Sequence, residues 1–200
     1  MKNNTKYLLS LLIFAIATLS LYPFSDCYSQ SYWDKIKRTS VGVQGAHYDM
    51  DAGIAIQITT PLFFSESFSL RFTGAVQWLE TYYQRRLDLI PYHSVRTGLV
   101  YNLPMEDRAR VYFEAGSFMI FPNKSFSHKE LVNGGYGVIG AEFFFYQHSR
   151  LVVSYFAEMG FTALDTKAER LQDERSYSNG LLVTTGFRFY PFGQKISVDE

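Results

Sequence analysis

The sequence predicts an all-β fold: an eight-stranded antiparallel up-and-down transmembrane β-barrel preceded by a cleavable signal peptide. Segments that alternate between apolar and polar residues recur along the chain, with turn-type residues between them. Aromatic residues make up 18% of the chain, with 15 Tyr and 18 Phe but only 2 Trp, and membrane barrels place such rings in girdles at both interfaces. Tight and long connections alternate, as they do in barrels with short periplasmic turns and longer outer loops.

The amino terminus has the layout of a secretory signal peptide. Lys2 and Lys6 precede an apolar run from Leu8 to Leu21, and small or polar residues follow. The run is shorter than the ~20 apolar residues of a membrane-spanning helix, so an uncleaved anchor is the less favoured alternative. We expect cleavage after Ser29, which makes residues 1–29 the signal peptide.

The lone cysteine, Cys27, is expected to leave with this leader. A lipoprotein signal requires a small residue before the cysteine, and Asp26 stands there instead. The mature chain is then free of cysteine, which excludes disulfide bonds and thiol catalysis. We divide that chain into a periplasmic segment over 30–38, the barrel over 39–192 and a periplasmic tail over 193–200.

The segment Arg108–Phe121 shows the two faces of a barrel strand most clearly. Successive side chains of an extended chain point to opposite sides, so charged and aromatic groups at Arg108, Arg110, Tyr112 and Glu114 share one face. Apolar side chains occupy the other face, at Ala109, Val111, Phe113, Ala115, Met119 and Phe121. One face suits lipid and the other carries ions, over a length sufficient for a tilted membrane strand of roughly 9 to 11 residues.

Eight such segments are predicted along the chain. In order they are Thr39–Tyr48, Ala52–Leu62, Ser67–Tyr83, Ile90–Leu103, Arg108–Phe121, Gly134–Tyr146, Arg150–Ala163 and Gly180–Pro191. The last one carries outward apolar or aromatic residues, which resembles the closing-strand signal of outer-membrane proteins. It does not stand at the extreme terminus, because Gly193–Glu200 follow it.

The predicted connections fall into two classes. Three are tight turns, placed on the periplasmic side: Phe63–Glu66, Pro104–Asp107 and Gln147–Ser149. Four lie on the outer side: a short one at Asp49–Asp51, an intermediate one at Gln84–Leu89, and two long polar ones at Pro122–Asn133 and Leu164–Asn179. An even number of strands with both termini in the periplasm matches this class of barrel.

Carrying the same alternation through every strand brings a set of ions to the inner face. They are Arg71, Arg96, Arg110, Glu114, Glu142, Glu158 and Arg188, whereas Glu80 near the outer rim faces out. An Arg or Lys in the middle of the lipid face costs ~2 to 4 kcal/mol, so this phasing is strongly preferred. We predict a lumen ion network in which Arg96 pairs with Glu114 and Arg110 pairs with Glu142.

A proton or ion path through the lumen is the functional alternative to such a network. Side chains fill the interior of an eight-stranded barrel, so a plugged lumen is favoured. The balance of 19 Lys+Arg against 19 Asp+Glu argues against nucleic acid as a partner.

No pattern of catalytic or metal-binding residues is found. The four histidines, His47, His93, His128 and His148, lie in separate segments without metal-ligand spacing. The acidic Asp49–Asp51 lacks the further ligands of a calcium site. We therefore predict no catalytic, cofactor-binding or metal-binding residue, no cofactor and no small-molecule substrate.

The run Ser176-Tyr177-Ser178-Asn179-Gly180 bears on catalysis directly. It resembles the His-x-Ser-Asn motif of lipid A deacylases, which are enzymes built on outer-membrane barrels, but Ser176 replaces the His that would act as base. A loop role for Ser178 is favoured, and a lipid A modifying enzyme is the least favoured of three functional hypotheses.

The mature chain resembles small outer-membrane barrels of the OmpX and OmpA transmembrane-domain type by its architecture. A narrower resemblance is to TraO, a conjugative-transposon protein. It is carried by Leu87-Asp88-Leu89-Ile90-Pro91, Gly98, Tyr101, Tyr136-Gly137, Glu142 and Arg150. That second resemblance implies an accessory role in a conjugal transfer or secretion assembly.

The favoured hypothesis is a non-enzymatic barrel of the outer membrane that acts as a structural or surface-interaction protein. Polar loops on a rigid scaffold commonly carry recognition, so an unknown protein partner is expected at the extracellular loops Pro122–Asn133 and Leu164–Asn179. Outer-membrane lipid is the expected partner of the barrel wall.

Overall fold

The computed structural model describes residues 38–48, 51–64, 67–83, 86–103, 108–148, 151–171 and 175–191. The predicted signal peptide, nearly all of the predicted N-terminal segment and the predicted tail lie outside these residues. No helix among the described residues is long and apolar enough to cross a membrane.

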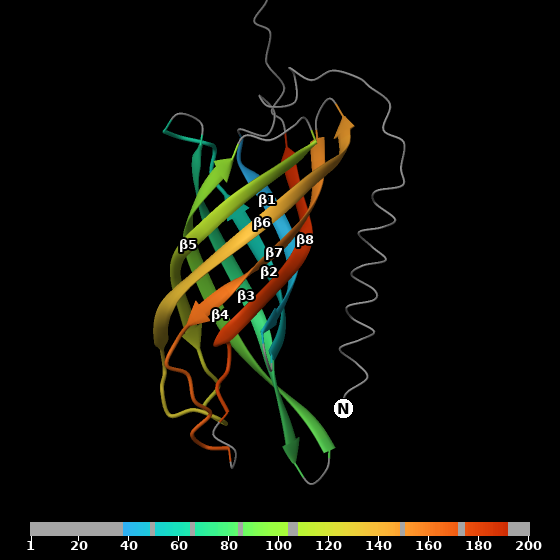
Figure 1. Ribbon diagram of the computed structural model, residues 1–200. Coiled ribbons are helices and arrows are strands. Elements are labelled where there is room, and N and C mark those ends of the chain that lie inside the picture. Colours follow the sequence, from blue (N-terminus) through green and yellow to red (C-terminus); the bar gives the residue numbers. More distant parts are fainter. Residues whose placement is uncertain are drawn as a thin grey trace, which may run out of the picture.

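The described chain forms a closed barrel (Figure 1). Its strands are β1 (Ser40–Tyr48), β2 (Asp51–Thr59), β3 (Phe68–Tyr83), β4 (Arg86–Leu103), β5 (Ala109–Phe121), β6 (Val132–His148), β7 (Leu151–Ala163) and β8 (Gly180–Pro191). Each strand pairs antiparallel with the next, and β8 pairs with β1 to close the sheet. The predicted all-β, eight-stranded antiparallel barrel is therefore confirmed.

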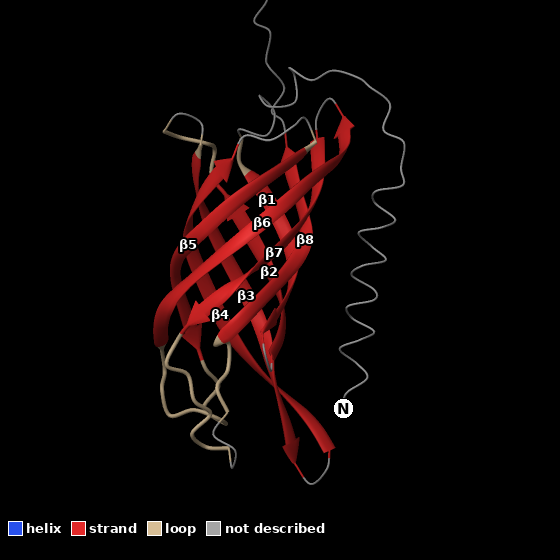
Figure 2. Ribbon diagram, viewed as in Figure 1, coloured by secondary structure: helices blue, strands red, loops and turns tan. Residues whose placement is uncertain are grey.

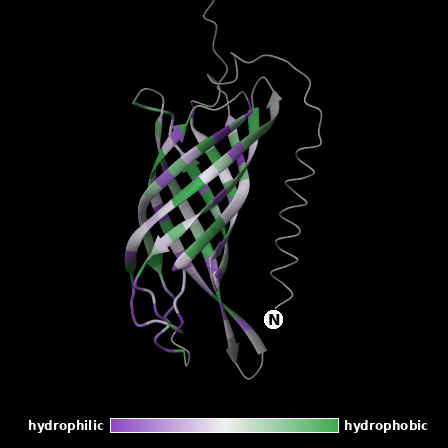
Figure 3. Cartoon of the chain, in the orientation of Figure 1, coloured by the Kyte–Doolittle hydropathy of each residue, from purple (hydrophilic) through white to green (hydrophobic). Residues whose placement is uncertain are grey.

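Strict alternation of side chains gives the barrel its two surfaces. In β1 and β2, buried and exposed residues alternate without a break, because successive side chains of a strand point to opposite faces. The exposed positions include Ile54 and Ile56, whose side chains are about 60% exposed. Figure 3 shows the resulting mixture of apolar and polar bands along the strands.

The two ends of the barrel differ. Loop 5 (residues 122–131) and loop 7 (residues 164–179) gather at one end, where the described parts of both are drawn as loop in Figure 2. The β3–β4 hairpin extends past the same end (Figure 1). The connections β2–β3, β4–β5 and β6–β7 lie at the opposite end, since the strands are antiparallel.

This hairpin corrects one sequence prediction. The segment Gln84–Leu89 was expected to be a loop, but β4 begins at Arg86, and its ladder with β3 runs from Phe68↔Tyr101 to Tyr83↔Arg86. On the other side of β3, pairing with β2 stops at Leu79. Residues beyond that point belong to a two-stranded ribbon, whose cross-strand pairing continues without support from the barrel.

Boundaries of β2 and β6 also differ from the prediction. β2 ends at Thr59 rather than Leu62, before Pro61, which has no backbone N–H to donate to a ladder. β6 is longer than predicted at both ends and contains a register shift between Phe144 and Tyr146. Asp51, expected in the first loop, is the first residue of β2.

Candidate functional site

The seven predicted lumen ions all lie inside the barrel. Their side chains come from β3 to β8 and alternate with lipid-facing residues on the same strands, and none is more than 4% exposed. Charges removed from water in this way require partners with good geometry.

Glu142 of β6 is the centre of the ion network at the end of the lumen opposite loops 5 and 7. Its Oε2 lies 2.7 Å from Nη2 of Arg110 and 2.6 Å from Nη1 of Arg188. The hydroxyl of Tyr190 donates to Oε1 over 2.6 Å, and the hydroxyl of Ser154 donates to the same oxygen. The carboxylate is fully buried and all its hydrogen-bonding capacity is used.

Glu158 of β7 holds the middle of the lumen. Its Oε1 lies 3.0 Å from Nη2 of Arg188 and 2.8 Å from Nη1 of Arg71. The hydroxyl of Tyr112 donates to the same oxygen over 2.6 Å, and the hydroxyl of Thr184 donates to Oε2. Arg188 thus bridges Glu142 and Glu158, which joins two levels of the lumen into one network.

Arg71 extends the network to Glu114. The same Nη1 that meets Glu158 also donates to Oε2 of Glu114, and the hydroxyl of Tyr136 donates to Oε1 of Glu114. Paired guanidinium and carboxylate groups therefore run from Arg110 to Glu114 without interruption. Chemically, this arrangement ties β3, β5, β6, β7 and β8 together through paired charges in the lumen.

Of the two ion pairs predicted from the sequence, the structure contains Arg110–Glu142 but not Arg96–Glu114. Arg110 and Glu142 are direct neighbours across β5 and β6. Arg96, however, pairs with Phe118, while Glu114 pairs with Val100, so the two side chains are offset by four residues along the ladder. The strands are tilted, and equal distance from a turn does not mean equal height in the barrel.

The sequence analysis placed Tyr112 on the ion-bearing face of its strand, but it assigned no hydroxyl group to the ion network. Tyr112, Tyr190 and Thr184 donate to the buried carboxylates, and each occupies an inward position on its strand. Tyr112 stands between Arg110 and Glu114, and Tyr190 follows Arg188 by two residues. The alternation that located the ions would have located these groups as well. Gly140 makes room for Tyr112, since an added Cβ there would lie 2.4 Å from the tyrosine ring.

Loops 5 and 7 fold against each other into a cap over one end of the barrel. The rings of Tyr92, Phe126 and Tyr177 pack edge to face, with centroids 5.0 to 5.7 Å apart. The backbone N–H of Arg170 donates to the carbonyl of Phe126, and its guanidinium donates to the carbonyl of Lys124. Burial raises the pKa of the Tyr177 hydroxyl above its ordinary value, so this group stays protonated within the cap.

A polar latch joins this cap to the barrel. Oδ2 of Asp51 accepts from the hydroxyl of Tyr92 and from the backbone N–H of Ser178, each over 2.6 Å. The Ser178 hydroxyl donates to Oε1 of Gln77 over 2.8 Å. Ser178 has a positive φ of 50° and is buried, so its hydroxyl is a structural group and is closed to a substrate in this conformation.

The histidines do not gather. Among the described residues there is no group of three or more His, Cys, Asp or Glu side chains that could hold a metal ion. His47 and His93 are exposed on strands of the wall, and His128 lies in loop 5 beside Arg170. The side chain of His148 lies outside the described part of the chain.

We expect loss of the latch to loosen the cap more than it destabilises the barrel. Replacing Asp51 with Ala removes the acceptor of two hydrogen bonds to a charged group, each worth ~1.5 to 3 kcal/mol. Trypsin should then cut at Lys167 and Arg170 of loop 7 at least about tenfold faster, measured by limited proteolysis of the folded barrel. The Asp165→Ala control removes an exposed ion pair to Lys129 and should leave the rate unchanged; equal rates for the two variants would contradict the latch.

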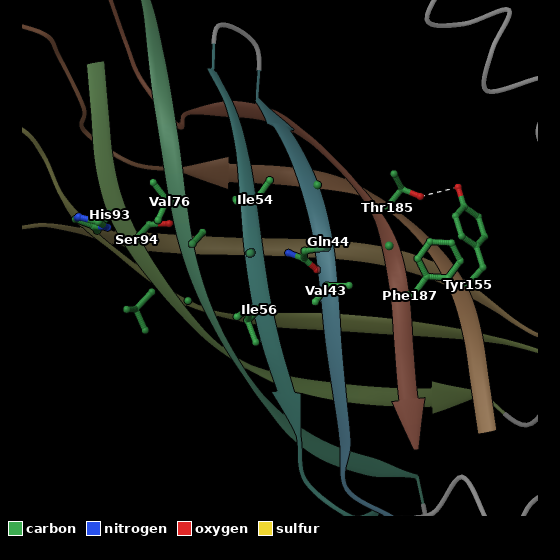
Figure 4. Close-up of a pocket in the computed structure, with 16 residues that line it drawn as sticks. Val43, Gln44, Ile54, Ile56, Val76, His93, Ser94, Tyr155, Thr185 and Phe187 are labelled. Carbon is green, nitrogen blue, oxygen red and sulfur yellow. Dashed lines mark hydrogen bonds between the residues drawn. The ribbon is translucent and has the colours of Figure 1, made fainter. Parts of the chain in front are cut away.

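The outer wall is apolar where β8, β1, β2, β3 and β4 run side by side. Figure 4 shows a shallow groove there, with Val43, Ile54, Ile56 and Val76 among its lining residues. No acidic residue, Lys or Arg is among the lining residues, and the hydroxyl of Thr185 is engaged by Tyr155 over 2.6 Å. A wall of this composition is suited to hydrocarbon contact.

No family model and no curated protein matches the chain. The N-terminal β-barrel domain of Pseudomonas aeruginosa OprF is similar in structure, with 12% identity, a TM-score of 0.46 and coverage of 77% of this chain and 96% of that one. The likeness is one of fold alone. The P. aeruginosa outer membrane protein OprG is similar at 8% identity and a TM-score of 0.46, covering 76% of this chain and 95% of its own. The Yersinia pestis outer membrane protein Ail is similar at 16% identity and a TM-score of 0.38, covering 77% and 98%.

Proposed function

We propose that the protein is a non-enzymatic outer-membrane β-barrel with a plugged, charged lumen, and that it acts as a structural or surface-interaction protein through its extracellular loops. The observation that carries this proposal is the cap. Its two loops have a common aromatic core and a latch to the barrel, so their outer face is held in one conformation. Preordered loops on a rigid scaffold lose little entropy on binding, which favours recognition of a partner.

The composition of the cap surface fits a protein partner. Lys124, Glu130 and Asp165 have side chains that are more than 80% exposed, and Leu131 beside them is about half exposed. Charges of both signs around an apolar residue resemble the polar rim and apolar centre of protein interfaces. The opposite end of the barrel has only short connections, so the cap is the larger surface.

The filled lumen supports a role without transport. The network from Arg110 to Glu114 occupies the interior at several levels, and the aromatic core of the cap lies over one end. Purified protein in planar bilayers should therefore give no stable ion conductance, and a steady open channel would contradict the plugged lumen.

Two narrower roles remain alternatives. A TraO-like accessory component of a conjugal transfer or secretion assembly would use the same cap against another protein of that assembly. A lipid A modifying enzyme would need an accessible nucleophile with a base, whereas Ser178 is buried beside Asp51 and Tyr92. The buried serine weighs against the enzyme.

The proposal is tested by photo-crosslinking on intact cells. A photoreactive amino acid replaces Lys167, which is exposed in loop 7, or Phe64, which is 77% exposed at the opposite end of the barrel. We expect illumination to give a discrete protein adduct from position 167 and none from position 64. Absence of any adduct at position 167 in the native host, or an equal adduct at both positions, would overturn the surface role.

A further inference from the structure

Arg96 differs from the other arginines of the lumen. Arg71, Arg110 and Arg188 each have a carboxylate oxygen within 3.0 Å, whereas Arg96 has none within 4.0 Å among the described residues. It is only 4% exposed, and its guanidinium lies over the ring of Tyr136, 5.3 Å from the centroid. A buried charge without a counter-ion is strongly unfavourable, and buried charges are normally paired.

The acids nearby form no direct ion pair with Arg96. Glu114, Glu142 and Glu158 are each engaged by other arginines and by hydroxyl donors. Asp51 is also buried, but it pairs with Leu79 whereas Arg96 pairs with Thr73. This offset of six residues along β3 corresponds to roughly 20 Å along the strand. Among the described residues, no carboxylate oxygen therefore pairs directly with the Arg96 guanidinium, and Glu114 and Glu158 act on its charge only from a greater distance.

Two hydroxyl groups stand beside Arg96 on the inner face. Thr73 is its direct partner across β3 and β4, and the Cβ atoms of such pairs are ~5 Å apart. Ser94 precedes Arg96 by two residues on β4 and so points to the same side. Both are about 3% exposed, and neither hydroxyl hydrogen-bonds to any residue in the described part of the chain.

Other buried polar groups in the surrounding lumen also lack hydrogen-bond partners. Neither amide atom of Gln44 on β1 has a hydrogen-bond partner, nor does the Nε2 of Gln77 on β3. Such groups are rarely left unsatisfied inside a protein. A ligand that accepts hydrogen bonds could pair with the N–H and O–H donors among these groups, while a cation would repel Arg96.

From these contacts we propose that Arg96, Thr73 and Ser94 form a buried site for a small monovalent inorganic anion of the halide class. One guanidinium and two hydroxyls offer donors and a single positive charge, which match a single negative charge. Aromatic rings limit the space at the site, since Phe118 pairs with Arg96 and the ring of Tyr136 lies against its guanidinium. A larger or doubly charged oxyanion would collide with these rings. The anion gives the Arg96 guanidinium a direct partner and is independent of the surface role proposed above.

The site is tested directly with bromide, which scatters anomalously. Crystals of the full mature protein grown in bromide should show an anomalous peak within about 4 Å of the Arg96 guanidinium. A peak at that place supports the site. A well-ordered lumen with only water beside Arg96, or bromide bound only at the outer surface, overturns it.

A second measurement uses thermal unfolding in detergent at equal ionic strength. The unfolding temperature of the wild-type protein should be at least about 2 °C higher in chloride than in gluconate, because a ligand that binds only the folded state stabilises it. The shift should disappear in Arg96→Met, which removes the cation, and persist in Lys124→Met, which removes an exposed one. An equal chloride-dependent shift in unfolding temperature for Arg96→Met and the wild type, or no shift for either, would overturn the proposal. The crystal test remains decisive even if the Met variant does not fold.

Discussion

Replacing Glu142 with Gln should destabilise the barrel by ~3 to 5 kcal/mol, because it leaves the buried Arg110 without its counter-charge and removes one of the two carboxylates that Arg188 contacts. Arg110 and Arg188 both lie within 2.7 Å of the Glu142 carboxylate, and neither has more than 4% exposed area. The substitution preserves shape and removes only the charge, so the loss reports the electrostatic role of this residue. Urea unfolding of the barrel in lipid vesicles, followed by tryptophan fluorescence, measures it.

The matched control is Glu130→Gln in loop 5. Glu130 lies 3.5 Å from Lys124, but both side chains are more than 80% exposed, and exposed ion pairs contribute ~0 to 1 kcal/mol. If the two Glu→Gln variants unfold at the same urea concentration, the lumen network contributes no more than a surface pair and its assigned role in holding the barrel is wrong.

Replacing Ile56 with Arg should have the second largest effect, a loss of ~2 to 4 kcal/mol when the barrel is folded in a bilayer. Ile56 is 60% exposed on β2, between Val43 and Gly74 on the neighbouring strands. In water, an arginine at such an exposed position would change stability little. In lipid, the guanidinium must leave water or distort the bilayer.

A pair of arginine variants therefore tests whether the outer wall faces water or hydrocarbon. Folding yield and unfolding free energy in vesicles are measured for Ile56→Arg and for Ser125→Arg, which places the same group on the exposed cap. We expect a loss for the first variant and none for the second. Equal stability of both variants in vesicles would mean that this wall does not face hydrocarbon.

Together the network and the wall describe a barrel that is inverted relative to a soluble protein, with apolar residues outside and ions inside. Burying these ions costs desolvation energy, and their contacts depend on which strands meet. Arg188, for example, contacts Glu142 and Glu158 from two other strands at once, which is possible only when the barrel is closed in this register. Mutual pairing also leaves little free charge in the lumen, apart from Arg96.

Much of this architecture is encoded locally. Alternation of side chains alone predicted eight strands, and for most of them the structure agrees within one or two residues of the predicted ends. The departures have physical causes outside the local pattern. β4 begins four residues earlier than predicted because β3 continues as its partner beyond the rim, and the loop predicted at Gln84–Leu89 is wrong for this reason.

By itself, the sequence determined which face of each strand carries ions, because a period of two leaves a side chain only two directions. Tertiary structure decided which ion meets which. Glu114 meets Arg71 and Tyr136 rather than Arg96, since closing eight tilted strands shifts the height of each residue by an amount that depends on the whole ring. The latch has the same origin: Asp51 and Ser178 are 127 residues apart in the chain, and only closure of the barrel brings them together.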